Sequence, residues 1–451
     1  MCARFRDPAG QGCYCQRLST ITRRNYQEEV LLRHTRKRVP RFARDDNRAD
    51  RKRNAEVVPT MTVSSRAAAR LRAGHLWVYR SDLASGNDAP PGALVHVRDE
   101  RGHKLGSALY SSASQIAIRL ISPDEISENA LTGLVAERID SAVTLRKRAT
   151  QNTDSCRVIF SEADLLPGLI VDKYNDVLSM QVLTQAFDRP DLRTAVLDVL
   201  GRRFSEASIL ERVESRIREL EQMPTRESQL LRGERFSTIF SMNGVRFHYD
   251  GLGGQKTGAF LDQRENYAAA VRWAHGEALD CFTYQGGFAL HLARVCERVT
   301  AIDISRPALE VAEQNEALNK PEHCCCEIEW IEANAFDLLR DYADAGRRYD
   351  TVVLDPPAFA KTKRVVTTAL KGYKELNLRA LKMLRPGGTL VTCSCSFHVS
   401  ETEFLEMLGS AAADTGRRVH ILEKRGAALD HPVLLNVPET AYLKCVNCRV
   451  V

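Results

Sequence analysis

The residues best suited to chemistry in this sequence stand at the ends of short apolar runs in its second half. Asp303 closes one run, Asp355 follows another and precedes two prolines, and the thiols Cys393 and Cys395 end a third. Parallel strands end at one edge of a doubly wound sheet, and such sheets hold their ligands there. The pattern therefore predicts a single site that brings two carboxylates and a thiol together.

The stretch Ala278–Ser305 predicts the element that binds a nucleotide. A strand-like run is followed by Gly286-Gly287, a helical pattern and a second apolar run that carries Asp303, 16 residues past Gly287. Glycines let the backbone approach a ligand, and the acid can accept hydrogen bonds from two ribose hydroxyls. The loop lacks the G-x-G-x-x-G spacing of a pyrophosphate site, so S-adenosylmethionine fits it better. A strand, turn and helix without any ligand is the alternative interpretation.

Asp355 and the two thiols suggest what happens at that edge. A carboxylate followed by Pro356-Pro357 lies on a rigid loop with few competing backbone donors, and it can hydrogen-bond the edge of an aminopyrimidine or a purine. A thiol at the end of a strand can be a nucleophile, although a buried cysteine is more often a small hydrophobic side chain. Spacing alone leaves both roles open for Cys393 and Cys395.

Composition places these motifs in a protein of several domains. With 451 residues, of which 44% are hydrophobic, the chain can form two or three domains with their own cores. No apolar run reaches the length of a membrane span, and the N-terminus lacks the apolar region of a signal peptide. We therefore expect a cytoplasmic protein that does not contact a membrane and whose 13 cysteines are reduced. Their spacing predicts no metal site, because Cys445 and Cys448 form a lone C-x-x-C pair.

The positive charge is concentrated at the N-terminus. Residues 1–60 hold 15 Lys and Arg against 7 Asp and Glu, a balance of +8, so a net charge of +6 leaves −2 for the rest. We interpret 1–61 as a basic, disordered extension because it has little hydrophobic periodicity. Such an arm could touch RNA phosphates, but a solvated extension without a function is the slightly favoured interpretation.

Turn signals organise the remainder of the chain. Asp99–Gly102, Asn175-Asp176 and Asn243-Gly244 each separate two strand-like runs and predict hairpin turns. The glycine-rich segment Gly251–Tyr267 suggests a phosphate-binding loop, but it fails the required pattern because position 255 is not glycine. A loop that covers the cofactor ahead of the first strand of the α/β domain suits this segment better.

From Thr62 to its end, the chain resembles the bacterial RlmI-type 23S ribosomal RNA cytosine-5 methyltransferases. The resemblance rests on separated sequence blocks: GHLWVYRSDL (74–83), SEADLLPGLIVDKY (161–174), GQKTGAFLDQR (254–264), FTYQGGF (282–288), DPPAF (355–359), GYKELN (372–377), SCS (394–396) and DHP…PE..YLK (430–444). It implies an α/β protein with a PUA-like RNA-binding domain over 62–123. A helical connector and small α+β domain over 124–250 would follow, and then a Rossmann-like class I methyltransferase domain over 251–451.

The resemblance also implies roles for individual residues. Cys395 would be the nucleophile, and Asp355 would hold and polarise the base. S-adenosylmethionine would be bound by the residues that match the family's loop and strand-end motifs: Asp262, Gln263, Arg264, Phe282, Thr283, Tyr284, Gly286, Asp303, Asn334 and Asp355. Asn334 departs from the Asp expected near the adenine amino group, and Cys393 adds a second thiol beside the expected one.

These roles fit the chemistry of cytosine. Its carbon 5 is a poor nucleophile until a thiolate adds to carbon 6 and converts the ring into an enamine-like adduct. The target must be unstacked to enter the pocket. The implied partner is ribosomal RNA, and the oligomeric state stays open, with a homodimer as one alternative. Rival interpretations are an RNA purine N-methyltransferase, a small-molecule methyltransferase and a non-catalytic RNA-binding or ribosome assembly factor.

Overall fold

The structure, a computed structural model, describes residues 57–84, 89–253, 259–320 and 326–451. Most of the predicted extension over 1–61, and the core of the predicted covering loop at 254–258, lie outside the described residues. The end of the extension was assigned wrongly. Strand β1 already begins at Thr60, and Met61 is fully buried in the first domain because alternate side chains of this strand point into the core.

The first domain is a five-stranded sheet in the order β1-β3-β4-β5-β2, with one α-helix packed against it. Its elements are β1 (Thr60–Val63), α1 (Ser65–Arg72), β2 (Trp77–Tyr79), η2 (Arg80–Asp82), β3 (Leu94–Asp99), β4 (Lys104–Tyr110) and β5 (Ile116–Ser122). The predicted hairpin is confirmed, since β3 and β4 are antiparallel and joined by a short turn after Asp99.

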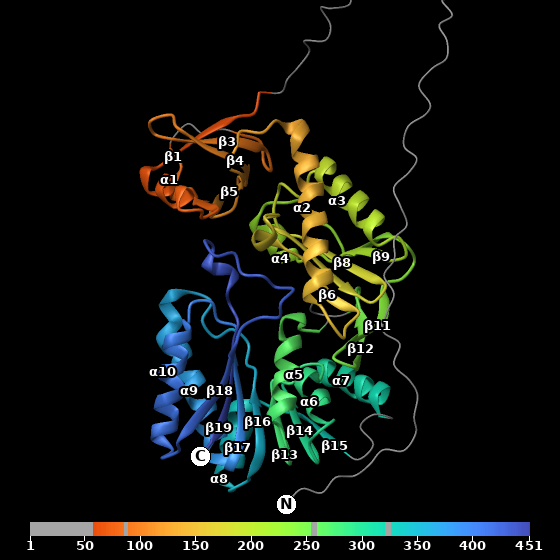
Figure 1. Ribbon diagram of the computed structural model, residues 1–451, viewed down its shortest axis with the longest axis vertical. Coiled ribbons are helices and arrows are strands. Elements are labelled where there is room, and N and C mark those ends of the chain that lie inside the picture. Colours follow the sequence, from red (N-terminus) through yellow and green to blue (C-terminus); the bar gives the residue numbers. More distant parts are fainter. Residues whose placement is uncertain (1–56, 85–88, 254–258, 321–325) are drawn as a thin grey trace, which may run out of the picture. The chain divides into compact units, whose positions relative to one another are not determined.

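The middle domain packs two long helices against a second sheet, in the order β10-β9-β8-β7-β6 (Figure 1). Its elements are α2 (Glu128–Ala149), β6 (Ser155–Phe160), η3 (Ser161–Asp164), β7 (Leu169–Tyr174), β8 (Val177–Val182), α3 (Pro190–Arg203), β9 (Ser208–Glu211), α4 (Ser215–Leu220) and β10 (Gln229–Arg232). A two-stranded ribbon, β11 (Ser237–Met242) and β12 (Val245–Asp250), follows. Both predicted two-residue turns are confirmed, with Asn175 and Asn243 at positive φ as their turn type requires.

The C-terminal domain is a doubly wound α/β domain. Its elements are η4 (Leu261–Gln263), α5 (Arg264–Trp273), β13 (Glu277–Cys281), α6 (Gly287–Leu292), β14 (Arg298–Asp303), α7 (Arg306–Asn319), β15 (Glu327–Glu332), α8 (Ala335–Asp344), β16 (Tyr349–Leu354), η5 (Lys363–Val365), α9 (Val366–Met383), β17 (Leu384–Ser394), α10 (Glu401–Asp414), β18 (Val419–Arg425), η6 (Pro438–Thr440) and β19 (Lys444–Val450).

The seven strands of this domain lie in the order β15-β14-β13-β16-β17-β19-β18. The first five are parallel, so Asp303, Asp355 and Cys395 all stand at or just beyond the carboxyl ends of their strands. Strands β18 and β19 are antiparallel additions that the sequence patterns did not predict. They matter for function because β19 runs beside the strand that carries the thiols.

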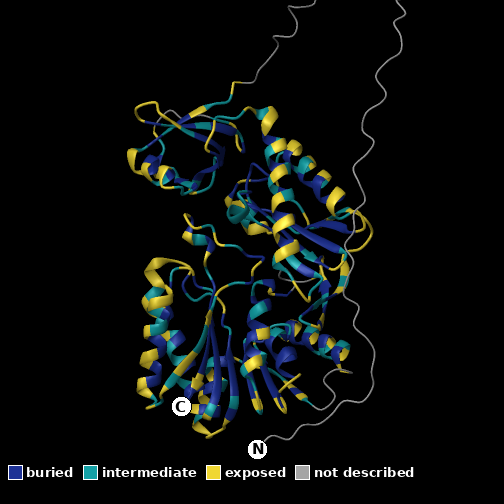
Figure 2. Ribbon diagram, viewed as in Figure 1, coloured by how far each residue is buried: buried dark blue, intermediate teal, exposed yellow. Residues whose placement is uncertain are grey.

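The central strands of the large sheet are buried on both faces, as Figure 2 shows, while the edge strands β15 and β18 are partly exposed. Helices α8, α9 and α10 form one core with Leu279, Val352 and Leu390, while α5 and α6 and the β11–β12 ribbon form the other with Val353 and Val391. Neighbouring residues of one strand thus belong to opposite cores. This two-sided packing fixes the strand ends that carry the chemistry.

The GHLWVYRSDL block contributes contacts that join the domains. His75 Nε2 lies 3.3 Å from a carboxylate oxygen of Glu439, and Trp77 Nε1 donates to Glu162 at 3.1 Å. Val437, from the C-terminal domain, is buried in the core of the first domain. We infer that this block ties the first domain to both others.

Three arginines of α1 in the first domain are paired with acidic side chains. Arg66 and Arg70 both donate to Asp82, and Arg72 donates to Asp99. Their charge is therefore partly neutralised within the domain.

Among the described residues, no helix is long and apolar enough to cross a membrane.

Candidate active site

The loop after β13 has the strained backbone typical of a ligand-binding loop. Phe282 and Tyr284 have positive φ angles of 66° and 53°, which residues other than glycine rarely adopt. Gly286 has a φ of 85°. The backbone N–H of Tyr284 donates to Asp303 Oδ2 at 2.9 Å, so the acid of β14 holds this loop. Sequence spacing alone did not reveal this contact.

Asp303 keeps acceptor capacity for a ligand. Its Oδ1 accepts only the backbone N–H of Ser305 at 2.9 Å among described donors, and the side chain is partly exposed. A carboxylate oxygen has two acceptor positions, so Asp303 can accept two ribose hydroxyls as well. Gly286 is required for space in addition to its φ, because a Cβ there would lie 2.8 Å from the Trp330 ring.

Asp280 is a second carboxyl group of this loop that the sequence patterns missed. It is fully buried in β13, and its Oδ2 accepts from Thr283 Oγ1 at 2.6 Å and from the backbone N–H of Ala289 at 2.9 Å. Its Oδ1 has no partner among the described residues. Burial raises the pKa of Asp280 to about 7. An acid inside the apolar run ALDCF was the signal that could have identified it.

A small cavity joins the strained loop to Asp355. Its walls include Phe260 and Tyr267 from the segment before β13, together with Phe282, Tyr284 and Asp355. The aromatic side chains of this cavity suit a purine, and the acceptor positions of Asp303, which holds the same loop, suit the ribose hydroxyls of a nucleoside. The residues present therefore fit S-adenosylmethionine.

Asp355 stands next to Gln263 in a poorly solvated position. Gln263 Nε2 donates to Asp355 Oδ2 at 2.9 Å, and Gln263 is itself oriented by Asn266. Burial raises the pKa of Asp355 to about 8, with a further contribution from the nearby carboxylate of Asp262. At neutral pH this carboxyl group is mainly protonated, so it can donate a hydrogen bond as well as accept one.

The two thiols differ sharply in their surroundings. Cys393 is fully buried in β17 opposite Cys445, and burial raises its pKa well above the usual range. Cys395 follows the end of that strand and is partly accessible, with its Sγ 3.8 Å from the backbone oxygen of Pro356. Cys395 is therefore the accessible thiol beside the Asp-Pro-Pro loop, whereas Cys393, which also interacts with Asp355 and Gln263, is buried inside the sheet.

Tyr373 of α9 fixes the loop that carries Cys395. Its hydroxyl lies 3.0 Å from Ser394 Oγ and 3.0 Å from Ser396 Oγ, the two residues that flank the thiol. Ser396 Oγ also accepts the backbone N–H of Ala360. The GYKELN block thus supports the SCS block through Tyr373, a contact between sequence segments about twenty residues apart.

Three predicted cofactor residues have partners within the protein, and their cofactor roles stay predictions. Arg264 is almost fully buried, and its guanidinium donates to Asp430 at 2.8 Å and to Glu265 at 2.8 Å. Asn334 is exposed at the end of β15, where its side-chain oxygen caps α8 by accepting from Phe336. Asp262 accepts from the Tyr442 hydroxyl.

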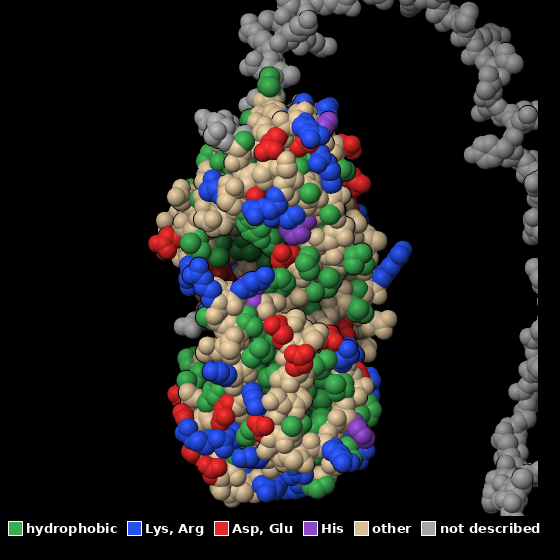
Figure 3. Space-filling model, turned by 90° about the vertical axis from the view of Figure 1, so that its left-hand side faces the viewer, with side chains coloured by type: hydrophobic (Ala, Val, Ile, Leu, Met, Phe, Trp, Pro, Cys, Tyr) green, Lys and Arg blue, Asp and Glu red, His purple; other side chains and the backbone are tan. Residues whose placement is uncertain are grey.

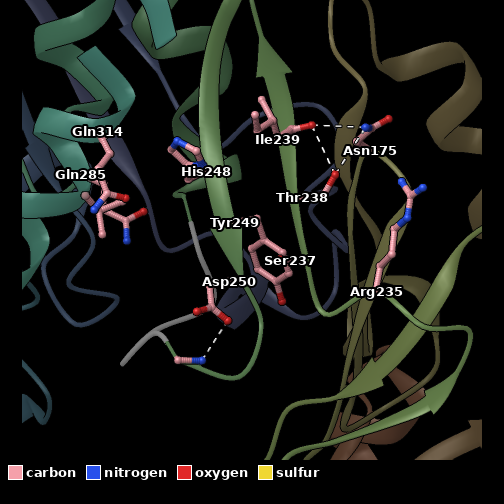
Figure 4. A pocket seen from close by; sticks show the side chains of 12 residues that line it. Asn175, Arg235, Ser237, Thr238, Ile239, His248, Tyr249, Asp250, Gln285 and Gln314 are labelled. Atoms are coloured by element: carbon pink, nitrogen blue, oxygen red, sulfur yellow. Dashed lines mark hydrogen bonds between the residues drawn. The ribbon is translucent and has the colours of Figure 1, made fainter. Parts of the chain in front are cut away.

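A larger cavity of about 810 Å³ lies beside the β11–β12 ribbon (Figure 4). Asn175, Thr238 and Asp250 line one side, while Gln285 and Gln314 face them from the C-terminal domain. Asn175 is occupied by hydrogen bonds to Thr238 and Ile239. This cavity contains none of the residues predicted to act in catalysis, so the candidate site is the edge that holds Asp303, Asp355 and Cys395.

Comparison with family models divides the chain in the same way. Residues 61–123 match a model described as a PUA-like domain. Residues 211–448 match a model described as an S-adenosylmethionine-dependent methyltransferase, which is more than half of the chain. The second match contains the whole candidate site.

Individual relatives match over most of their length. Ribosomal RNA large subunit methyltransferase I of Photobacterium profundum is 36% identical over 390 residues, which cover 84% of this chain and 96% of the relative. The protein of the same name from Vibrio cholerae is 36% identical over 387 residues, with the same coverage.

Two solved structures share the fold. A methyltransferase complexed with SAH has a TM-score of 0.74 and 19% identity, and a methyltransferase from Streptococcus mutans has a TM-score of 0.72 and 18% identity. Each match covers 87% of this chain and 100% of the other.

Proposed function

Because the chain belongs to the S-adenosylmethionine-dependent methyltransferase family, together with ribosomal RNA large subunit methyltransferase I, we propose that it methylates carbon 5 of a cytosine in large-subunit ribosomal RNA. The observation that supports this most is the pairing of an accessible thiol with a protonated carboxyl group. Cys395 and Asp355 meet at the sheet edge, whereas Cys393 is sealed in the core.

Asp355 suits recognition of the base. The pairing edge of cytosine presents a ring nitrogen that accepts a hydrogen bond and an amino group that donates one. A protonated carboxyl group can donate to the ring nitrogen and accept from the amino group, and a pKa of about 8 keeps that form populated at neutral pH. Proton donation to the ring nitrogen withdraws electrons from carbon 6 and prepares it for addition.

Cys395 suits the covalent step. Its Sγ gives an electron pair to carbon 6, a sulfur–carbon bond forms, and the electrons of the ring double bond move toward the ring nitrogen that holds the proton of Asp355. S-adenosylmethionine supplies the methyl group to carbon 5 and keeps the electron pair of the broken bond. Water then takes the proton from carbon 5, the electrons of that carbon–hydrogen bond restore the ring double bond and expel Cys395 as a thiolate, and the ring nitrogen returns its proton to Asp355.

The substrate class is supported by the remainder of the chain. A PUA-like domain precedes the catalytic domain, and the named relatives act on ribosomal RNA by their names. Figure 3 shows a hollow on one face whose lining includes hydrophobic side chains and whose surroundings carry Lys and Arg. Such a face suits an unstacked base and its phosphates. We place this activity in the cytoplasm.

The mechanism can be tested by trapping. RNA that carries 5-fluorocytosine cannot lose its carbon-5 substituent, so the adduct with the enzyme should persist in a denaturing gel when S-adenosylmethionine is present. The variant Cys395→Ala should abolish that adduct, and the matched control Cys393→Ala should keep it. The reverse pattern would assign the nucleophile to Cys393.

An adduct that survives both substitutions would exclude the cysteine mechanism. Methylation of RNA by Cys395→Ala would instead favour the purine N-methyltransferase alternative, in which no thiol is required. The substrate itself can be identified by mass spectrometry of ribosomal RNA nucleosides from cells with and without the gene. Loss of one 5-methylcytidine from large-subunit RNA is the expected result, and an unchanged profile would contradict the proposal.

A further inference from the structure

Lys444 is a buried cation to which the reaction above gives no role. It is the first residue of β19, opposite Ser394 of β17, and only 8% of its surface is exposed. Its Nζ donates to the backbone oxygen of Ser396 at 2.6 Å and to that of Tyr442 at 2.9 Å. The ammonium is therefore held at the residue that directly follows Cys395.

This cation has no carboxylate partner of its own. Among the residues that the structure describes, none forms an ion pair with Lys444, and its two acceptors are neutral carbonyl groups. Burial of an ammonium without a counter-ion is costly, and it lowers the pKa of Lys444 to about 8. A glutamine, whose amide has two N–H donors, could satisfy two carbonyl oxygens without that cost. The positive charge itself therefore calls for an explanation.

Cys395 lies in surroundings that disfavour its anionic form, the thiolate. Burial and the carboxyl groups of Asp355 and Asp262 raise the pKa of its thiol to about 11, although a nucleophile needs the thiolate. The positive charge of Lys444 acts against this rise. The two groups are thus complementary, because the Lys444 ammonium lacks a paired anion and the Cys395 thiolate would need a cation.

We propose that Lys444 is a positioning residue for Cys395: its buried ammonium, anchored on the carbonyl oxygens of Ser396 and Tyr442, is the counter-charge that stabilises the Cys395 thiolate. The inference rests on the proposed role of Cys395 as the nucleophile. It explains why a lysine from the last strand, in the terminal YLK block, lies beside a motif almost fifty residues earlier in the chain. The proton released by the thiol passes to solvent.

Other ionisable groups around this pair must stay unchanged in any test. They come from the loop after β16, from η4, from α9, from α10 and from the segment before β19. These groups are Asp355, Asp262, Tyr373, Glu403 and Tyr442. Glu403 interacts with Lys444 itself, while Asp355 and Asp262 disfavour the thiolate in their ionised forms, so Lys444 is the cation on which the balance depends.

The experiment measures alkylation of Cys395 by iodoacetamide as a function of pH in the full-length protein. Mass spectrometry of the peptide that contains Cys395 separates it from the other cysteines. Lys444→Gln keeps a donor for the carbonyl oxygens but removes the charge, and it should slow alkylation near pH 8 about tenfold. Lys444→Arg keeps the charge and should stay within about threefold of the unaltered protein.

A matched control is Lys424→Gln, which removes an exposed lysine of β18 whose ammonium pairs with Glu401. It should leave the alkylation profile unchanged. If Lys444→Gln reacts like the unaltered protein, or if Lys444→Arg is as slow as Lys444→Gln, the charge does not act on the thiol and the inference is wrong. Should the glutamine variant fail to fold, the arginine variant decides alone, because a tenfold slower reaction there would also overturn the inference.

This measurement needs no RNA, so it separates the two proposals. Absence of a 5-fluorocytosine adduct together with charge-dependent alkylation would reject the nucleophile and keep the Lys444–Cys395 pair. A normal adduct with charge-independent alkylation would keep the nucleophile and reject the role of Lys444.

Discussion

Two buried carboxyl groups of the C-terminal domain show how the same side chain serves architecture in one place and chemistry in another. Asp430 accepts from the guanidinium of Arg264 at 2.8 Å, from the backbone N–H of Arg157 at 2.9 Å and lies 3.0 Å from the ring of His431. Asp355 receives one hydrogen bond, from the neutral amide of Gln263. One carboxylate is surrounded by donors and positive charge, and the other is not.

The consequence is an opposite shift in acidity. Burial on its own would raise the pKa of Asp430, but His431 and Arg264 hold it below its usual range. Burial and the neighbouring Asp262 raise the pKa of Asp355 to about 8. Asp430 is therefore an anion that joins the C-terminal domain to the middle domain, and Asp355 is a neutral acid that can exchange a proton. The number of cations in contact, rather than burial, separates the two roles.

The largest expected effect is the loss of the structural pair. Asp430→Asn leaves the buried guanidinium of Arg264 with Glu265 as its remaining carboxylate, and it should lower the free energy of unfolding by about 1.5–3 kcal/mol. Urea unfolding followed by circular dichroism measures this. The matched substitution Asp355→Asn replaces one neutral group by another of the same shape at about pH 4, where Asp355 is still largely protonated in both states, and there it should change stability by less than about 1 kcal/mol. Equal losses in the two variants would contradict the comparison.

The pH dependence of stability should have opposite signs at the two positions. Asp355 stays protonated in the folded state while the unfolded state ionises, so it destabilises the protein as pH rises from about 4 to about 8. The free energy of unfolding of Asp355→Asn, relative to that of the unaltered protein, should therefore increase from about pH 4 to about pH 8. The contribution of Asp430 is present above about pH 4 and is lost as pH falls below it.

Urea unfolding of the unaltered protein and both variants tests these signs, at several pH values between about 4 and 8 for Asp355 and below about pH 4 for Asp430. A constant difference between Asp355→Asn and the unaltered protein would mean that Asp355 is ionised in the folded state. The base-recognition role proposed for its protonated form would then be wrong.

Asp303 is a third carboxylate, and beside its two backbone donors it keeps acceptor positions that a ligand can use. Its loss should affect cofactor binding more than folding. One carboxylate that accepts two ribose hydroxyls contributes roughly 1.5–3 kcal/mol per bond at most, so Asp303→Ala should weaken binding of S-adenosylmethionine about tenfold or more. Calorimetry measures the affinity. Glu332→Ala, at the exposed end of the neighbouring β15, is the control and should bind normally.

The smallest expected effect concerns Tyr373, which supports the chemical region without contacting the reacting atoms. Tyr373→Phe removes the hydroxyl that contacts Ser394 and Ser396 and should cost about 1 kcal/mol in stability. It should also slow formation of the 5-fluorocytosine adduct, because the loop that carries Cys395 loses its anchor. An unchanged adduct rate would show that the loop is held by other contacts.

Local sequence patterns determined much of this fold. Asn175-Asp176 and Asn243-Gly244 identify hairpins because few residues tolerate the positive φ of such turns. Apolar runs that end in Asp303 and Asp355 identify parallel strands whose ends meet at one edge. These signals depend on residues a few positions apart, so the printed sequence contains all of them. The motif blocks likewise predicted Cys395, which follows the strand, as the nucleophile, and this role stays a prediction.

Contacts between distant segments were decided only by the tertiary structure. Arg264 matches a cofactor motif, but it pairs with Asp430, 166 positions later, because folding buries both in one place. Lys444 and Tyr373 reach the loop of Cys395 from other elements, and no spacing in the sequence connects them. The protonation of Asp355 also follows from its surroundings. Charge state depends on which groups fold next to a side chain, whereas the side chain's type and its place on a strand are already present in the sequence.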